Sequence, residues 1–184
     1  MLAGNTVGVQ VPLSAPMFSW PILKYEDEFM RHPKMIRWAT IYLRWSLGLT
    51  FLSACADRFG LWGPHGSRYA VWGDWSHFAA YSATLNSFLP AWLQTPAACI
   101  ATIAEISFGL ALVGGFFLKQ AAYGSAVLLG LFALAMTISL GIKAPLNYSV
   151  FVDAGAAWLL ACMLEQTYEF TLKSRTTSHT AQAT

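Results

Sequence analysis

Long apolar runs, broken by a few polar residues, dominate the second half of the chain. Three of them follow one another between Ala97 and Glu165. Each run is close in length to the roughly 20 residues that an α-helix needs to cross the hydrocarbon core of a bilayer. The pattern therefore predicts spanning helices over about 97–118, 121–142 and 146–166.

A fourth apolar segment precedes these three. It extends from about Lys34 to Phe59, contains the run IYLRWSLGLTFLSACA, and ends at a charged pair followed by Gly60, which is a typical helix stop. Arg44 interrupts the run. At 1.5 Å per residue it lies about 12 Å from Ile36, so its side chain can reach back to the side where the helix enters the membrane or pair within the bundle.

The connection between the first and second helices is long and rich in aromatic residues. Turns are expected at Gly63-Pro64 and at Gly73, and residues 75–89 have the semi-polar, aromatic composition of a helix at a membrane surface. Trp and Tyr are enriched at the headgroup level of membrane proteins. We therefore predict an additional interfacial helix in this loop.

The predicted fold is all-α: an integral membrane four-helix bundle with an interfacial helix in the outer loop. Residues 1–35 are expected to form an N-terminal cytoplasmic or interfacial segment, residues 36–166 the transmembrane domain, and residues 167–184 a polar C-terminal tail. The composition agrees, because 11% of the residues are charged, against about 25% in a soluble domain. The net charge of +2 gives no reason to expect nucleic acid as a partner.

The basic residues are distributed unevenly between the two sides of such a bundle. With four spans, one side carries Lys24, Arg31, Lys34, Arg37, Lys119, Lys173 and Arg175, and the other carries Arg58, Arg68 and Lys143. Positive charge accumulates on the cytoplasmic side of membrane proteins. We therefore expect both termini in the cytoplasm and the aromatic loop outside.

Ionisable residues lie at matching depths in the predicted helices. Measured from the outer side, Glu105 lies about 13 Å along its helix and Asp153 about 12 Å along the last one. Asp57, Arg58 and Lys143 stand at outer helix ends. An ionisable side chain inside a membrane costs at least roughly 2.5 to 3.5 kcal/mol on insertion scales and marks a candidate functional site. These five groups are therefore expected to meet in the outer half of the bundle.

Two arrangements would satisfy such a cluster. The charges can form an ion-pair network that only holds the helices together, or they can line an outward-facing polar pocket for a quinone headgroup or a small anion. We favour the pocket, because polar groups at this depth usually mark a site. Its catalytic, proton-handling residues would be Glu105 and Asp153, and its substrate- or quinone-binding residues Asp57, Arg58, Lys143 and Asn147.

Familiar catalytic and metal-binding motifs are absent from the sequence. It has no GxSxG, P-loop, GxGxxG or CxxC motif. All four histidines lie outside the predicted spans, so the spans offer no pair of axial haem ligands. His65 and His77 lie near Asp74 in the outer loop and could bind a metal, but a loop histidine is more often solvated, and we predict no metal site.

Four separated blocks of the sequence resemble one family. They are LSACADRFGLWGPHG, WGDWSHFAAYSATLNSFLP, AEISFGLALVGGF and GIKAPLNYSVF. In this order they are similar to the DoxX/DoxD-like family of four-helix membrane proteins, and the resemblance covers about Ile36 to Leu164. The recurrent polar positions of the family correspond here to Asp57, Arg58, Glu105, Lys143, Pro145 and Asn147.

The resemblance implies a multi-pass protein of a bacterial or archaeal cell (inner) membrane. DoxD-type members are similar to the small subunit of thiosulfate:quinone oxidoreductase, so a redox-associated subunit that binds a quinone or a small sulfur anion is the leading interpretation. Because the sequence has no electron carrier of its own, redox chemistry would need a bound quinone or a partner protein; no covalently bound cofactor is expected. Whether the chain is itself an enzyme is open. The alternative is a non-catalytic accessory subunit of a larger membrane protein complex, with other subunits and the lipid bilayer as its partners.

Overall fold

A computed structural model describes residues 33–182 of the chain, and residues 167–182 by their backbone alone. Contacts divide the chain into the units Met1–Trp38 and Ala39–Thr184. Among the described residues, the first unit is represented only by the beginning of the first helix, and the bundle of helices belongs to the second unit. The predicted N-terminal segment lies, up to residue 32, outside the described residues.

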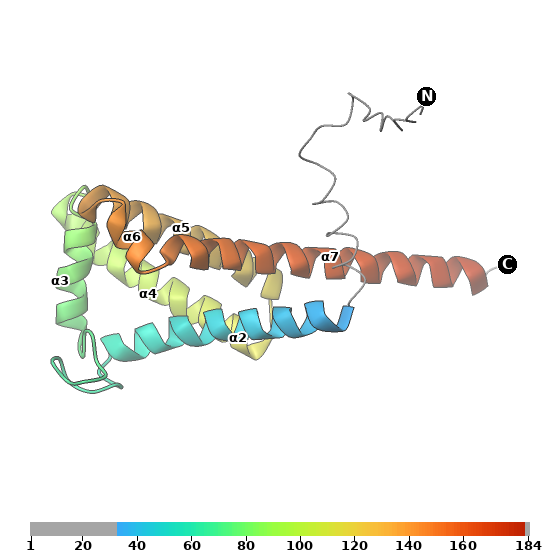
Figure 1. Ribbon diagram of the computed structural model, residues 1–184, viewed down its shortest axis with the longest axis horizontal. Helices are drawn as coiled ribbons and strands as arrows, with labels where there is room; N and C mark the ends of the chain where they lie inside the picture. Colours follow the sequence, from blue (N-terminus) through green and yellow to red (C-terminus); the bar gives the residue numbers. More distant parts are fainter. Residues whose placement is uncertain (1–32, 183–184) are drawn as a thin grey trace, which may run out of the picture. The chain divides into compact units, whose positions relative to one another are not determined.

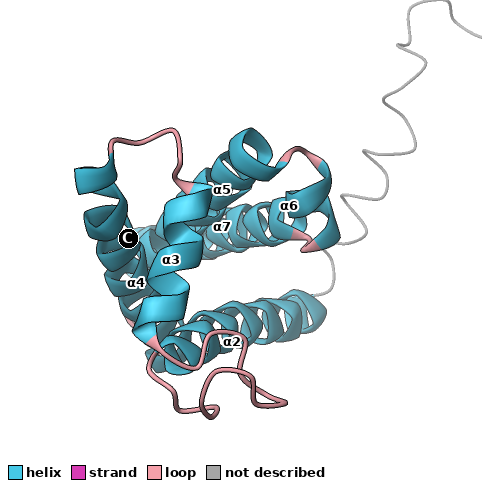
Figure 2. Ribbon diagram, turned by 90° about the vertical axis from the view of Figure 1, so that its left-hand side faces the viewer, coloured by secondary structure: helices cyan, strands magenta, loops and turns pink. Residues whose placement is uncertain are grey.

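The described part of the chain is all-helical, as the hydrophobic pattern predicts. Its helices are α2 (Pro33–Arg58), α3 (Trp75–Leu85), α4 (Ala91–Gly114), α5 (Leu118–Leu140), α6 (Lys143–Asn147) and α7 (Val150–Gln182). The predicted helix in the aromatic connection is present as α3. Figures 1 and 2 show α3 lying crosswise at one end of the long helices, next to the start of α4 and the end of α5.

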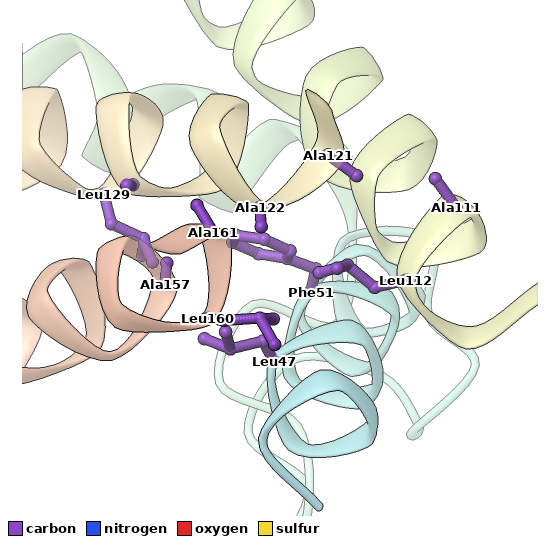
Figure 3. Packing of buried hydrophobic residues seen from close by; sticks show 11 residues of the cluster. Leu47, Phe51, Ala111, Leu112, Ala121, Ala122, Leu129, Ala157, Leu160 and Ala161 are labelled. Atoms are coloured by element: carbon purple, nitrogen blue, oxygen red, sulfur yellow. The ribbon is translucent and has the colours of Figure 1, made fainter. Parts of the chain in front are cut away.

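The core is built from small and branched apolar side chains of α2, α4, α5 and α7. Buried alanines line the contact between α5 and α7, among them Ala122 on α5 and Ala157 on α7. Phe51 of α2 and Leu160 of α7 fill the space that these short side chains leave (Figure 3). Small residues allow helix backbones to approach closely, so that packing is extensive even without bulky side chains.

Helices α2 and α4 approach each other at two glycines. A Cβ atom added to Gly48 would lie 2.8 Å from Val113 and 3.1 Å from the backbone oxygen of Gly109. A Cβ atom added to Gly109 would lie 2.9 Å from Leu52. This contact holds the middle of α2 against the last third of α4, within a few turns of Arg58 and Glu105 on the same two helices.

The start of α4 differs from the prediction. We expected the helix to begin after Pro96, but it begins at Ala91, after Pro90, and Pro96 lies inside it. A proline in the second turn removes a single helical hydrogen bond, because the N–H groups of the first turn have no helical partner in any case. The helix therefore accommodates Pro96 near its start.

The last predicted helix is divided in two. Residues 143–147 form the short α6, and α7 begins at Val150 after Ser149, which has a φ of 56°. A positive φ is uncommon for a serine, and it turns the chain between the two helices. Helix α7 then continues to Gln182, so the predicted polar tail is helical over most of its length.

Two of the described helices, α4 and α5, are long and apolar enough to cross a membrane. Only 33% and 39% of their most apolar windows are buried within the structure. Large apolar side chains on these helices are exposed instead: Ile100, Ile103 and Leu110 on α4, and Val127, Leu131, Leu134 and Ile138 on α5. This pattern is that of a helix with an apolar surface on its outside as well as its inside, which is typical of membrane helices.

Candidate functional site

The structure brings Arg58, at the end of α2, against Glu105, in the middle of α4. Atom Nη1 of Arg58 lies 2.5 Å from Oε2 of Glu105, and the two side chains are only 7% and 3% exposed. A buried charge is stable when an opposite charge and hydrogen bonds compensate for its lost hydration. The meeting of these two predicted residues on separate helices is thus found in the structure.

Two further side chains complete the pair. Arg58 Nη1 donates a hydrogen bond to Oγ1 of Thr102 at 2.7 Å, and the Thr102 hydroxyl in turn donates to the carbonyl oxygen of Ala98. The thiol of Cys55 donates to Oε2 of Glu105 at 3.3 Å. Each partner lies three residues before the charge on the same helix, Cys55 before Arg58 and Thr102 before Glu105, so each helix presents both of its residues on one face.

The cross-lying helix α3 covers the pair. The Phe78 ring lies over the guanidinium of Arg58, with Cζ 3.9 Å from the ring centroid, and Phe78 itself is buried. Trp72 and Trp75 pack against Phe78 with centroid distances of 5.9 and 5.4 Å. The guanidinium therefore has a carboxylate at one side and an aromatic face above it, which is a favourable cation–π geometry.

One edge of the Arg58 guanidinium is not used. Its hydrogen bonds and its ion pair within the described residues all involve Nη1, while Nε is buried without a partner. The Nε–Nη2 edge is the one that binds a carboxylate, an oxyanion or a carbonyl oxygen through two parallel N–H groups. This edge can thus donate two hydrogen bonds to an oxygen-bearing ligand while Nη1 stays paired with Glu105.

Asp57, although it is adjacent to Arg58, has different partners. Its Oδ2 accepts hydrogen bonds from the backbone N–H groups of Val71 and Trp72 at 3.0 and 2.9 Å, and its Oδ1 accepts one from Gly73 at 3.3 Å. A Cβ atom at Gly73 would overlap the backbone nitrogen of His65, so only glycine fits there. The Asp57 carboxylate holds the loop between α2 and α3 in place.

No hydrogen bond or ion pair within the described residues joins the other three predicted site residues to this cluster. Lys143 and Asn147 are exposed on α6, and Asp153 is partly buried in the first turn of α7. Of the five ionisable groups that we expected to meet, the structure pairs Arg58 with Glu105, and the place of Lys143 and Asp153 at the site stays a prediction.

The break before α7 changes the place of Asp153 within its helix. The predicted depth of Asp153 was counted from Pro145 along one continuous helix. Because α7 begins anew at Val150, Asp153 is only about 5 Å from the helix start at 1.5 Å per residue. Asp153 thus stands in the first turn of α7, where the helix dipole favours a negative charge.

Three residues of the cluster were not assigned to the site from the sequence. They are Cys55, Thr102 and Phe78. The spacing of three residues between Cys55 and Arg58, and between Thr102 and Glu105, was an available signal, because such residues share a helix face. No local signal could have identified Phe78, which reaches Arg58 only through the path of the loop.

A second polar cluster links α5 to α7 far from α3. Glu165 accepts a hydrogen bond from Lys119 Nζ at 2.5 Å and one from the Tyr123 hydroxyl at 2.7 Å. The side chains of Lys119 and Glu165 are both 42% exposed. This pair is partly solvated, in contrast with the buried pair of Arg58 and Glu105, and it provides a natural control for experiments on the buried pair.

The two histidines of the outer loop stack on each other. The rings of His65 and His77 lie 3.6 Å apart and nearly parallel, and Nδ1 of His77 lies 2.7 Å from Oδ2 of Asp74. In the described residues, no group of three His, Cys, Asp or Glu side chains is placed to hold a metal ion. Asp74 serves instead as the N-cap of α3, where it accepts hydrogen bonds from the Ser76 hydroxyl and the His77 backbone N–H.

Asp74 should make the start of α3 sensitive to acid. Hydrogen bonds from the Ser76 hydroxyl, the His77 backbone and the His77 ring hold the pKa of Asp74 well below its usual range. A lowered pKa in the folded state means that the stabilisation is complete above the ordinary Asp pKa of about 3.9 and is lost as the pH falls below it. Hydrogen-exchange protection of the first-turn amides of α3 should thus be constant from neutral pH to about pH 5 and decrease in stronger acid.

The matched control for this prediction is Asp74→Asn. Asparagine caps helices about as well as aspartate but does not titrate, so its protection should not decrease in acid. Asp74→Ala should lose protection at every pH. Equal acid sensitivity of the Asp and Asn forms would contradict the assignment of the pH dependence to Asp74.

Comparison with known proteins adds no family to this geometry. No protein-family model, no curated protein and no solved structure matches the chain. The resemblance to the DoxX/DoxD-like family thus stays an expectation from the sequence, and the structure contributes the geometry of the Arg58–Glu105 cluster.

Proposed function

We propose that this chain is an integral membrane protein in which α2, α4, α5 and α7 cross the bilayer and the Arg58–Glu105 cluster forms an outward-facing polar site. The site takes a quinone headgroup or a small sulfur anion, and the protein acts as a redox-associated membrane subunit. The observation that carries this proposal is the buried guanidinium of Arg58, whose Nε has no partner while its Nη1 pairs with Glu105.

The chemistry of the ligand follows from the free edge of Arg58. Two N–H groups pointing the same way bind an oxygen atom of a quinone or of an oxyanion, and charge-assisted hydrogen bonds are strong where the local dielectric constant is low. Glu105, which pairs with Nη1 of the same guanidinium, would accept or release the proton that accompanies reduction or oxidation of the ligand. The electrons would come from a partner protein or from the ligand, since no carrier is evident in the sequence.

The exposed apolar surfaces of α4 and α5 support the membrane part of the proposal. The resemblance to DoxX/DoxD-like proteins supports the redox part and a location in a bacterial or archaeal inner membrane with cytoplasmic termini. For Lys143, Asn147 and Asp153, a role in binding or catalysis stays a prediction from the sequence.

Ligand binding to the purified protein tests the proposal. A short-chain ubiquinone analogue and thiosulfate are titrated separately into the full chain in lipid nanodiscs. We expect one of them to bind, and Glu105→Gln to weaken that binding by about tenfold or more, which corresponds to about 1.4 kcal/mol. Where quinone-dependent turnover is measurable, the same change should abolish it.

Glu165→Gln is the matched control, because it removes a paired carboxylate at the other polar cluster. It should leave binding unchanged. If neither probe binds, or if both glutamine variants bind like the unchanged protein, the proposed site is wrong.

The alternative is an accessory subunit of a larger membrane complex, and one observation favours it. Large apolar side chains are exposed on the loop beside α3, namely Phe59, Leu61, Trp62, Tyr69 and Val71. An exposed apolar patch of this kind can dock another protein. Purification in a mild detergent discriminates, since a stoichiometric partner supports this reading and an isolated monomer speaks against it.

A further inference from the structure

Arg44 is a guanidinium in the apolar part of α2 that has no protein partner in the described part of the chain. Its Nε is buried and has no acceptor, and none of the hydrogen bonds or ion pairs of the described residues includes its other nitrogens. In this it differs from Arg58, which pairs with Glu105. An arginine has five N–H donors and stays charged at any physiological pH, so the acceptors for Arg44 must come from outside the described chain.

The side chain of Arg44 lies beside the turn between α4 and α5. A Cβ atom on Gly115 would be 3.5 Å from Nη1 of Arg44. The backbone N–H groups of Gly115 and Phe116 both donate to the carbonyl oxygen of Ala111, so this acceptor already has two donors. The carboxylate of Glu165 on α7 accepts hydrogen bonds from Lys119 and Tyr123.

Exposed aromatic side chains surround this position. Tyr42 and Trp45 on α2 and Phe116 and Phe117 in the turn are all exposed. Aromatic side chains with this exposure concentrate at the headgroup level of a bilayer. The turn and Arg44 thus have the composition of a membrane boundary, about 21 Å along α2 from Arg58 at 1.5 Å per residue.

We propose that Arg44 binds the phosphate of a phospholipid headgroup in the leaflet that contains the α4–α5 turn. Phosphate oxygens match the planar fork of a guanidinium, which donates two parallel hydrogen bonds to them. A long arginine side chain also keeps its stem in the apolar region while its charged end reaches the headgroups. The site rests on the membrane placement proposed above, but it is separate from the Arg58–Glu105 site.

The proposal is tested by titrating the full chain in detergent with phosphatidylglycerol and measuring the bound lipid by native mass spectrometry. Arg44→Gln should weaken the first lipid-binding event by about tenfold, the effect of losing about 1.4 kcal/mol of interaction. Arg68→Gln is the control, because Arg68 is an exposed arginine of the outer loop whose cation–π contact is with Tyr69. It should leave lipid binding unchanged.

Two results would overturn the proposal. One is equal lipid affinity of Arg44→Gln and the unchanged protein. The other is displacement of the lipid by millimolar inorganic phosphate, which would show a site for free anions. If Arg44→Gln does not fold, the contact can be measured in the unchanged protein by solid-state NMR. Lipid phosphorus near Arg44 should dephase the arginine Cζ signal, and a lack of dephasing excludes the contact.

The test is independent of the proposed ligand site. Quinone or thiosulfate binding probes Arg58 and Glu105 at the end of α2 next to α3. The lipid titration probes Arg44, which is about 21 Å away along α2 at 1.5 Å per residue. A protein that binds phosphatidylglycerol through Arg44 and neither redox probe would retain the lipid site and lose the proposed function.

Discussion

Replacing Arg58 by methionine should lower the free energy of unfolding by about 3 to 5 kcal/mol, because it leaves the carboxylate of Glu105 buried without a cation. The Glu105 side chain is 3% exposed, so water cannot replace the guanidinium. Thr102 would also lose the donor that its hydroxyl oxygen accepts from. The loss is measured by denaturant or thermal unfolding of the purified protein in a mild detergent.

A second substitution separates charge from packing. Arg58 contacts the Phe78 ring as well as Glu105, so part of the loss could come from the missing stem and ring contact. The double variant Arg58→Met/Glu105→Leu has no charge left to compensate, and apolar replacement of a whole buried pair is often neutral or stabilising. It should therefore recover most of the loss.

The control is Lys119→Met at the partly solvated pair with Glu165. Half-exposed ion pairs contribute little to stability, so this change should have a much smaller effect than Arg58→Met. If Arg58→Met is as stable as the unchanged protein, the buried pair is not an ionic contact. If the double variant is no more stable than the single one, packing against Phe78 accounts for the loss.

The outcome for the double variant also bears on function. If apolar residues replace the Arg58–Glu105 pair without loss of stability, the pair is not needed for folding. Buried ionisable residues in a membrane protein then indicate a functional site. The double variant should in addition fail to bind the ubiquinone analogue or thiosulfate, whichever binds to the unchanged protein. It would then be nearly as stable as the unchanged protein and yet lack ligand binding.

The hydrophobic pattern was sufficient to predict the helices, because the length of an apolar run and the composition of its ends are local properties. The predicted helices at about 97–118 and 121–142 correspond to α4 and α5, and the aromatic stretch after Gly73 corresponds to α3. The pairing of Arg58 with Glu105 could also be anticipated, since it depends only on the positions of two charges along two antiparallel helices.

The features that were not predicted depend on contacts between distant parts of the chain or on unusual backbone conformations. The left-handed backbone of Ser149 divides α6 from α7, and a serine carries no sequence signal for it. Because of that division, Asp153 stands in the first turn of a new helix. In the same way, the partners of Asp57 are backbone groups more than ten residues away, and no side-chain pattern identifies them.

Replacing Asp57 by alanine should release the loop between α2 and α3 and destabilise the protein by at least about 3 kcal/mol, since hydrogen bonds to a charged acceptor contribute about 1.5 to 3 kcal/mol each. Three backbone N–H groups would lose their acceptor. Hydrogen exchange should show loss of protection at the amides of residues 71–73, measured together with the free energy of unfolding. Asp57→Asn should be intermediate, because an amide offers one oxygen where the carboxylate offers two.

This series also decides between two roles for Asp57. The sequence led to its interpretation as a ligand-binding residue, whereas both of its oxygens are occupied by the loop backbone. A structural role predicts that stability and amide protection decrease in the order Asp, Asn, Ala. The affinity for the ubiquinone analogue or thiosulfate should then decrease only indirectly, because a loosened loop displaces α3 and moves Phe78 away from Arg58. If instead Asp57→Ala keeps full protection of residues 71–73 and loses the ligand, Asp57 contacts the ligand directly and the loop is held by other interactions.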